Sequence, residues 1–111
     1  RYVLKKSLEK ATKKSYTYNT GPEMEFFLLK SNNGKYTVHD NGGYFDLVLD
    51  EAYEIRRDIT MALWDFGIKS EAAHHEVAQG QHEIDILYGN ALNLADNVVT
   101  LRFVVKSIAK L

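Results

Sequence analysis

The stretch HHEVAQGQHEID, residues 74–85, constrains the fold most, because a glycine lies in a short polar connection between two extended segments. A hairpin there makes the two segments antiparallel neighbours in a sheet. With its centre between Gln79 and Gly80, the hairpin places Glu76 directly opposite Glu83. Carboxylates in that position have Cβ atoms about 4.5–5.5 Å apart and repel each other. A cation between them would turn this repulsion into attraction.

The periodicity of the remaining chain predicts an α+β fold. Strands are expected over residues 22–30, 70–78 and 82–88, and helices over residues 50–66 and 91–110. The helices would cover one face of an antiparallel sheet. They would bury two apolar stripes, which are Ala52, Ile55, Ile59, Leu63 and Phe66 in the first helix and Ala91, Leu94, Val98, Leu101, Val105 and Ile108 in the second.

Residues typical of helix ends support these boundaries. Asp50 and Asn90 are expected N-caps, and Gly67 is expected just past the end of the first of these helices. A lysine-rich helix over residues 2–14 and a turn over residues 31–35 complete the predicted elements.

The composition is that of an ordinary globular chain. Its 14 basic and 15 acidic residues leave a formal charge of −1, so no overall field would attract nucleic acid or an anionic membrane. No apolar run approaches the roughly 18 residues of a membrane span. The absence of cysteine excludes disulfides and thiolate metal sites, and it fits a reducing cytoplasm. The chain has 111 residues, starts with arginine and stops within a helical pattern, so we expect a piece of a longer protein.

A second acidic pair lies in GPEMEFF, where Glu23 and Glu25 share one face of the expected strand. Met24, Phe26 and Leu28 point to the other face and are expected in the core. Each acidic pair alone is most simply explained by exposure to solvent or by protonation of one member. Together, the four carboxylates supply the hard oxygen ligands that Mg²⁺ and Mn²⁺ prefer.

The histidines near these acids favour a structural role. His74 and His75 alternate faces on a strand, and the hairpin pairing places His74 opposite Asp85 in a structural imidazole–carboxylate contact. His82 lies on the face opposite Glu83. We therefore expect magnesium or manganese here rather than zinc.

The segments GPEMEFFLL, GGYFD and HHEVAQGQHEID, followed by AD at 95–96 and VVK at 104–106, occur in the order and spacing of bacterial and archaeal glutamine synthetases. The chain resembles the N-terminal portion of that family's catalytic domain over residues 1–111. Met24 is one departure, because the family often has proline at this position.

The resemblance implies a role for each of the four acids. Glu25, Glu76 and Glu83 would hold one metal ion close to the substrate glutamate. Glu23 would hold a second metal ion that binds the phosphates of ATP.

Glu71 and Tyr88 match family positions near ATP, and the hairpin pairing places them opposite each other. Regular pleating puts this pair on the face opposite Glu76 and Glu83. One site can hold both pairs only if a bulge, a strong twist or a strand end intervenes.

The activity implied by the resemblance is the ATP-dependent synthesis of glutamine from glutamate and ammonia through γ-glutamyl phosphate, with two Mg²⁺ or Mn²⁺ ions. The family assembles as a homo-oligomeric ring, and much of its active site lies beyond these residues. Alone, the chain is expected to be inactive and to bind metal weakly. The alternatives are a γ-glutamyl ligase for amines or polyamines, a non-catalytic structural relative, and a carboxylate hydrolase that needs no metal.

Overall fold

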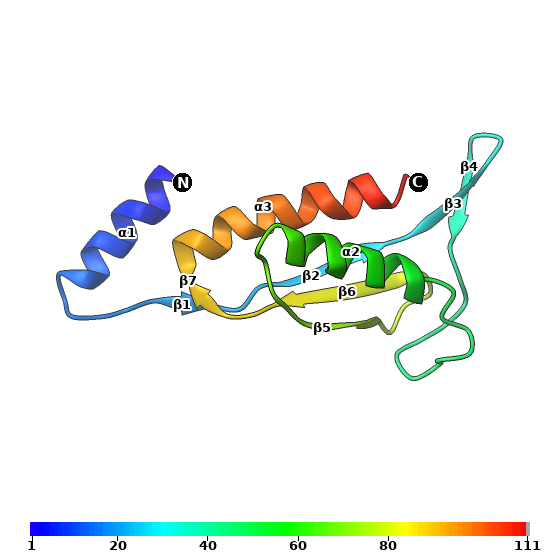
Figure 1. The fold of residues 1–111 in the computed structure, drawn as a ribbon, viewed down its shortest axis with the longest axis horizontal. Coiled ribbons are helices and arrows are strands. Elements are labelled where there is room, and N and C mark those ends of the chain that lie inside the picture. The colour runs from blue at the N-terminus through cyan, green and yellow to red at the C-terminus, as the bar shows by residue number, and fades with distance from the viewer. Residues whose placement is uncertain (111) are drawn as a thin grey trace.

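The computed structural model describes residues 1–110, which form an elongated α+β molecule of 54 × 29 × 24 Å. Helices α2 and α3 lie along the same side of an antiparallel sheet with the strand order β2-β6-β5 (Figure 1). These elements comprise α2 (Tyr53–Asp65), α3 (Ala91–Ile108), β2 (Glu23–Phe27), β5 (Ser70–His75) and β6 (Gln81–Ile86). The predicted fold class, with helices on one face of an antiparallel sheet, is confirmed.

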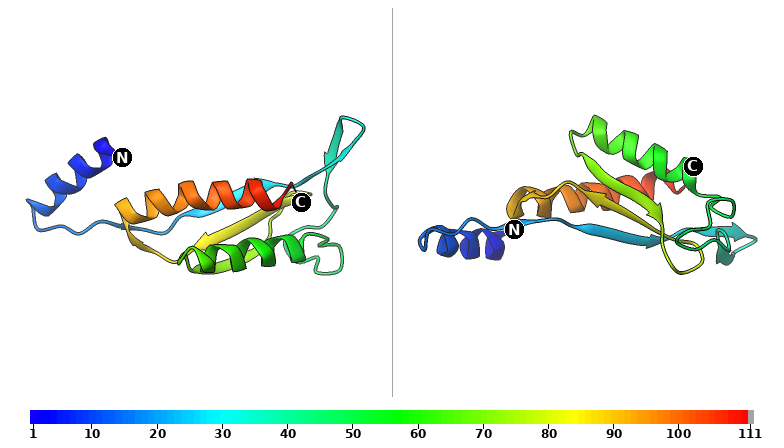
Figure 2. Two further views of the ribbon diagram at one scale, coloured as in Figure 1. Left: turned by 45° about the horizontal axis from the view of Figure 1, so that its top comes forward. Right: turned by 90° about the horizontal axis from the view of Figure 1, so that it is seen from below.

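Smaller elements extend from both ends of this body. Two of them are the short antiparallel pairs β1–β7 and β3–β4, and the third is helix α1, which projects away from the sheet (Figures 1 and 2). Their bounds are α1 (Tyr2–Thr12), β1 (Asn19–Thr20), β3 (Leu29–Asn32), β4 (Lys35–Val38) and β7 (Gly89–Asn90). None of the α1 side chains is buried within residues 1–110. Over the same residues, no helix has both the length and the apolarity needed to cross a membrane.

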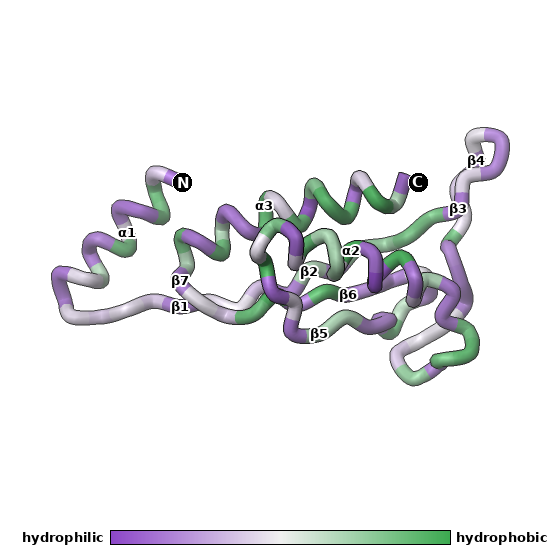
Figure 3. Tube along the Cα trace, viewed as in Figure 1, coloured by the Kyte–Doolittle hydropathy of each residue, from purple (hydrophilic) through white to green (hydrophobic). Residues whose placement is uncertain are grey.

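The core lies between the sheet and the two long helices. Figure 3 shows that α3 is more hydrophobic along its length than α1. The cluster of buried residues comprises Ile59, Leu63, Ile68, Ile84, Ile86, Leu94, Leu101, Val104 and Val105. Both predicted stripes are confirmed in their central positions. Phe66 is the exception, with 61% of its surface exposed, because α2 ends at Asp65 and the helical periodicity no longer applies.

The predicted strand over residues 22–30 is interrupted at Leu28. Its N–H donates to the Gly80 carbonyl at 2.9 Å, and its own carbonyl accepts from His39 N–H at 3.0 Å. These bonds divert the backbone out of β2 and into the β3–β4 hairpin. Leu28 is buried, and Met24 and Phe26 are partly buried against the core, as predicted.

The helix-end predictions are confirmed at two of the three positions. Asn90 caps α3 by accepting from Leu92 N–H at 3.0 Å, and Gly67 follows α2 in the left-handed region with φ +74°. Asp50 is not the N-cap of α2, because the helix begins later, at Tyr53.

Asp50 binds an arginine instead of capping α2. Its carboxylate accepts from Arg56 at 2.8 Å and from Ala52 N–H at 3.2 Å. Both charged side chains are almost fully buried. The acid is therefore used as the partner of a buried cation.

The β5–β6 hairpin is the main correction to the predicted structure. His74 pairs with Glu83 and His75 pairs with His82, and Glu76 N–H donates to the Gln81 carbonyl at 2.8 Å. The hairpin is therefore centred one residue earlier than predicted, and Glu76 does not lie directly opposite Glu83. The pairing shifts by two residues, which preserves the face on which each side chain lies.

The connecting loop explains the shift in pairing. The loop comprises residues 77–80. It contains a turn closed by a hydrogen bond from Gln81 N–H to the Ala78 carbonyl at 3.0 Å. Gly80 is its last residue and adopts φ +68°. Four-residue connections of this kind are built on a type I turn, whereas the prediction assumed a shorter, tighter one.

Candidate metal centre

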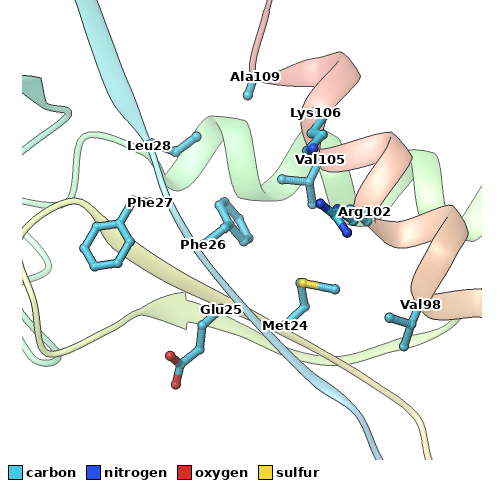
Figure 4. A pocket seen from close by; sticks show the side chains of 10 residues that line it. All are labelled: Met24, Glu25, Phe26, Phe27, Leu28, Val98, Arg102, Val105, Lys106 and Ala109. Atoms are coloured by element: carbon cyan, nitrogen blue, oxygen red, sulfur yellow. The ribbon is translucent and has the colours of Figure 1, made fainter. Parts of the chain in front are cut away.

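The open face of the sheet, which lies opposite the helices, gathers acidic side chains from β2 and β6 and His74 from β5. Glu23 pairs with Asp85, Glu25 pairs with Glu83, and Glu83 also pairs with His74. Directly paired residues point to the same face of a sheet, so all five side chains share one face. Figure 4 shows the alternation along β2, where the side chain of Glu25 points away from α3 and those of Met24 and Phe26 point toward it.

One part of this face brings three possible ligands together. His74, Glu76 and Glu83 each offer one atom, and these atoms lie within 4.8 Å of one another. His74 lies 3.7 Å from each acid, through Nδ1 to Glu76 and through Nε2 to Glu83. The two acids are diagonal neighbours across the hairpin, which keeps them close although they are not directly opposed.

His74 was not among the metal ligands predicted from the sequence. It was predicted to lie opposite Asp85 as a structural residue, and its observed pairing with Glu83 shows that this prediction is wrong. The error follows from the length of the hairpin loop. The spacing itself was informative, because His74 and Glu76 are two residues apart and share a face of an extended segment.

The charges of this cluster are poorly neutralised. Glu83 is 7% exposed, and burial, followed by the neighbouring Glu76 and Asp85, raises its pKa to about 8. The pKa of Glu76 is lowered, first by a hydrogen bond from Val77 N–H at 3.0 Å and then by Glu83. Within residues 1–110, the charged contacts of Glu76 and Glu83 are with His74. One acid is therefore charged and the other holds a proton.

Three further acids lie close to this cluster on the same face of the sheet. Glu25 is opposite Glu83 and accepts from Gln81 Nε2 at 2.8 Å. Glu23 and Asp85 form the next same-face pair, about 7 Å further along the sheet. Asp85 Oδ1 is buried and has no hydrogen-bond partner within residues 1–110. Hard oxygen donors and an unpaired buried carboxylate oxygen fit a divalent cation, and no lysine or arginine within residues 1–110 forms an ion pair with Glu76 or Glu83.

Glu71 occupies a β-bulge in β5. Ser70 pairs with Ile86 and Ala72 pairs with Asp85, which leaves Glu71 unpaired between them. The predicted opposition of Glu71 and Tyr88 is therefore wrong. Regular alternation assigned Glu71 to the face opposite Glu76 and Glu83. The bulge interrupts this alternation, and a bulge is one of the features that the sequence predicted to be necessary for a single site.

A second group of possible ligands lies on the helix side of the same hairpin. Asp40, His75 and His82 are buried and also offer atoms within 4.8 Å of one another. His75 Nε2 donates to Asp40 at 2.8 Å, and Arg56 donates to His82 Nδ1 at 3.0 Å. The Asp40 carboxylate already accepts from His75, and the Arg56 guanidinium lies beside His82, so this group does not fit a metal ion, although His82 Nε2 has no hydrogen-bond partner within residues 1–110.

The guanidinium also affects the protonation of His82. Burial, followed by the positive charges of Arg56 and His75, lowers the pKa of His82 to about 4. His82 is therefore neutral, and Nδ1 is free to accept from Arg56.

A hollow of about 420 Å³ between β2 and α3 lies mainly on the helix side (Figure 4). Apolar side chains form much of its lining, which is Met24, Glu25, Phe26, Phe27, Leu28, Val98, Arg102, Val105, Lys106 and Ala109. It is separate from the His74–Glu76–Glu83 cluster.

The carboxylates on the open face of this sheet are groups that can bind a divalent cation. The sequence profile of the glutamine synthetase catalytic domain matches residues 1–111. The chain belongs to the glutamine synthetase family.

Curated relatives carry the same name. The glutamine synthetase of Methanosarcina mazei is 54% identical over 98% of this chain and 25% of its own length. That of Clostridium saccharobutylicum is 51% identical over 99% of this chain and 26% of its own length. The chain thus spans about a quarter of the length of these relatives.

Solved structures share the fold. GmaS in complex with ADP superimposes with a TM-score of 0.81 at 30% identity, over 96% of this chain and 26% of that one. Plasmodium falciparum glutamine synthetase superimposes with a TM-score of 0.78 at 22% identity, over 97% of this chain and 28% of that one. The second likeness concerns the fold alone.

Proposed function

We propose that the protein carrying this chain is a glutamate–ammonia ligase, in which ATP phosphorylates the γ-carboxylate of glutamate and ammonia then displaces phosphate to give glutamine. Family membership over the whole chain supports this reaction. The observation that supports it in this chain is that Glu83 has carboxylate or imidazole atoms of Glu76 and His74 within 4.8 Å and pairs across the sheet with Glu25 on the open face.

These three acids are the proposed ligands of one divalent ion, Mg²⁺ or Mn²⁺. His74 lies 3.7 Å from Glu83 and is close enough to join them or to orient them. When bound, such an ion screens the repulsion between the γ-carboxylate of glutamate and the phosphates of ATP. Glu83 must release the proton that its burial and the neighbouring Glu76 and Asp85 favour before it can act as a ligand.

Glu23 is the proposed ligand of a second divalent ion, on the side of the site that faces ATP. Its partner across the sheet is Asp85, so it lies on the same face as Glu25. A single carboxylate binds Mg²⁺ weakly, because the ion gives up its water reluctantly. Further ligands for this ion would come from parts of the protein outside these residues.

Glu71 and Tyr88 are the proposed contacts to ATP. Both side chains are exposed, and Tyr88 has 66% of its surface accessible. An exposed aromatic ring offers a flat surface for the base, and the bulge at Glu71 directs the chain out of the regular pleat. These features support Glu71 and Tyr88 as ATP contacts, a role first inferred from their matching positions in the family.

A homo-oligomeric ring in the cytoplasm is also part of the proposal. Residues 44–49 expose large apolar side chains, including Phe45 at 88% and Val48 at 96%. Surfaces of this kind are normally covered by other parts of a protein or by a neighbouring subunit.

The direct test is an assay of the full-length protein with glutamate, ATP and ammonium, with and without Mg²⁺ or Mn²⁺. We expect glutamine and ADP to form only when a divalent ion is present. If product forms only with amines or polyamines, the proposed substrate becomes such an amine instead of ammonia. No product with any amine, or full activity in a chelator, would refute it.

A further inference from the structure

Asp40 joins three separate parts of the chain behind the carboxylate face. Its side chain is fully buried, and its carboxylate accepts from His75 Nε2 at 2.8 Å, from Gly80 N–H at 3.2 Å and from Glu51 N–H at 3.2 Å. These donors belong to β5, to the loop of the β5–β6 hairpin and to the segment before α2. One acid therefore fixes both sides of the hairpin loop.

His75 extends this contact to a proposed metal ligand. Its Nδ1 donates to the main-chain carbonyl of Glu76 at 2.6 Å, while Nε2 donates to Asp40. Both ring nitrogens face acceptors, so both carry hydrogen and the ring can bridge the two groups. The Glu76 carbonyl is thereby tied to Asp40 through a single rigid ring.

Glu76 depends on this contact because of its place in the chain. β5 ends at His75, so Glu76 lies just past the strand, next to the loop of residues 77–80, and its N–H donates to the Gln81 carbonyl. A ligand at the end of a strand is held less firmly than one inside it, whereas a metal centre requires its ligands to be placed to within about 0.5 Å. Glu83, in contrast, lies within β6 between two neighbouring strands.

We propose that Asp40 and His75 are positioning residues of the metal centre, which hold the main chain of Glu76 from the helix side so that its carboxylate meets Glu83 on the open face. This inference rests on the proposed function, because it assumes that Glu76 is a metal ligand. Neither residue touches the metal or the substrates. Their effect is on the geometry of the ligand set.

The test compares two buried aspartates in the full-length protein. Asp40→Asn keeps the shape of the side chain but removes the charge that His75 and Gly80 share. Asp50→Asn makes the same chemical change in the ion pair with Arg56, which has no hydrogen bond to the hairpin loop. Mn²⁺ affinity is measured from the electron paramagnetic resonance signal of the free ion, and unfolding by urea gives the stability of each variant.

We expect Asp40→Asn to weaken Mn²⁺ binding by about tenfold or more, in the range seen for residues that orient metal ligands. Asp50→Asn should lower stability and leave Mn²⁺ affinity within about threefold of the wild type. His75→Gln, which cannot bridge Asp40 and Glu76, should reproduce the loss of affinity and provides a second variant if Asp40→Asn does not fold. Equal affinity losses in the Asp40 and Asp50 variants, or unchanged affinity in both Asp40→Asn and His75→Gln, would overturn the inference.

Two controls separate this inference from the proposed function. Wild-type protein should bind Mn²⁺, and Glu83→Gln should weaken that binding more than Asp40→Asn does. If wild-type protein does not bind Mn²⁺, or if Glu83→Gln binds it normally, the metal centre itself is wrong and the positioning role falls with it.

Discussion

The two faces of the β5–β6 hairpin carry similar groups of acids and histidines, but their charges are balanced on one face and not on the other. On the open face, His74, Glu76 and Glu83 lie together with an excess of negative charge. On the helix face, Asp40, His75 and His82 lie just as close together, but the Arg56 guanidinium lies beside them and donates to His82 Nδ1.

The difference shows that spacing and residue type do not define a metal site. Both groups satisfy the same distance criterion, and the buried one contains the two histidines that would attract zinc. What separates them is their net charge. Arg56 neutralises the helix side, and no arginine or lysine forms an ion pair with Glu76 or Glu83 within residues 1–110.

The largest expected effect comes from removing the cation on the helix side. Arg56→Ala leaves Asp50 charged and buried without a partner, which should cost about 3–5 kcal/mol of unfolding free energy. Arg57→Ala is the matched control, because Arg57 is exposed and its ion pairs are with exposed acids. Urea unfolding of both variants measures the difference. Similar losses in the two would show that the helix side is not held by this ion pair.

The next effect is on turnover and belongs to the open face. Glu76→Gln and Glu83→Gln in the full-length protein should each lower glutamine formation by more than about 100-fold, because each removes a metal ligand. Their folding stability should change little, since the substitution also removes the repulsion between the acids.

The control for these variants is Glu54→Gln, which alters an exposed acid paired with Arg57 on α2. It should leave the rate of glutamine formation unchanged. Normal turnover in Glu83→Gln would remove Glu83 from the ligand set.

Much of this contrast follows from sequence patterns alone. The alternation in GPEMEFF placed Glu23 and Glu25 on one face and Met24 and Phe26 on the other, because side chains on a strand alternate whatever their partners are. The stripe of α3 and its cap at Asn90 were predicted for the same reason, since both depend on local spacing.

The remaining features depend on contacts between distant segments. The hairpin loop is longer than predicted because Gly80 bonds to Leu28 and Asp40, neither of which is near it in the sequence. Asp50 was assigned as a helix cap because its buried partner, Arg56, was not identified. His74 was misplaced as a consequence of the loop.

The smallest expected effect is the dependence of folding stability on pH. His82 on the helix face and Glu83 on the open face should change this stability in opposite directions. His82 has a pKa of about 4 in the folded chain and 6.5 ordinarily, so as pH falls below 6.5 the unfolded state takes up the proton first and stability decreases. Glu83 has a pKa of about 8 in the folded chain and 4.5 ordinarily, so the folded state holds the extra proton and stability increases as pH falls from 8 toward 4.5. In the metal-free wild type, the two trends should largely cancel.

Single substitutions should separate these trends. Metal-free Glu83→Gln should lose about 2 kcal/mol of unfolding free energy between about pH 6.5 and about pH 4.5, because Glu83 no longer opposes the His82 contribution. His82→Gln should become more stable over the same range. Denaturant unfolding in a chelator at each pH measures both, and parallel pH profiles for the two variants would contradict the assignment of opposite protonation states.

The most direct test of the central claim is an anomalous difference map from crystals of the full-length protein grown with Mn²⁺. A peak bordered by Glu25, Glu76 and Glu83 is the predicted result, with no peak among Asp40, His75 and His82. A peak on the helix side, or an open face without any peak at saturating Mn²⁺, would contradict the account.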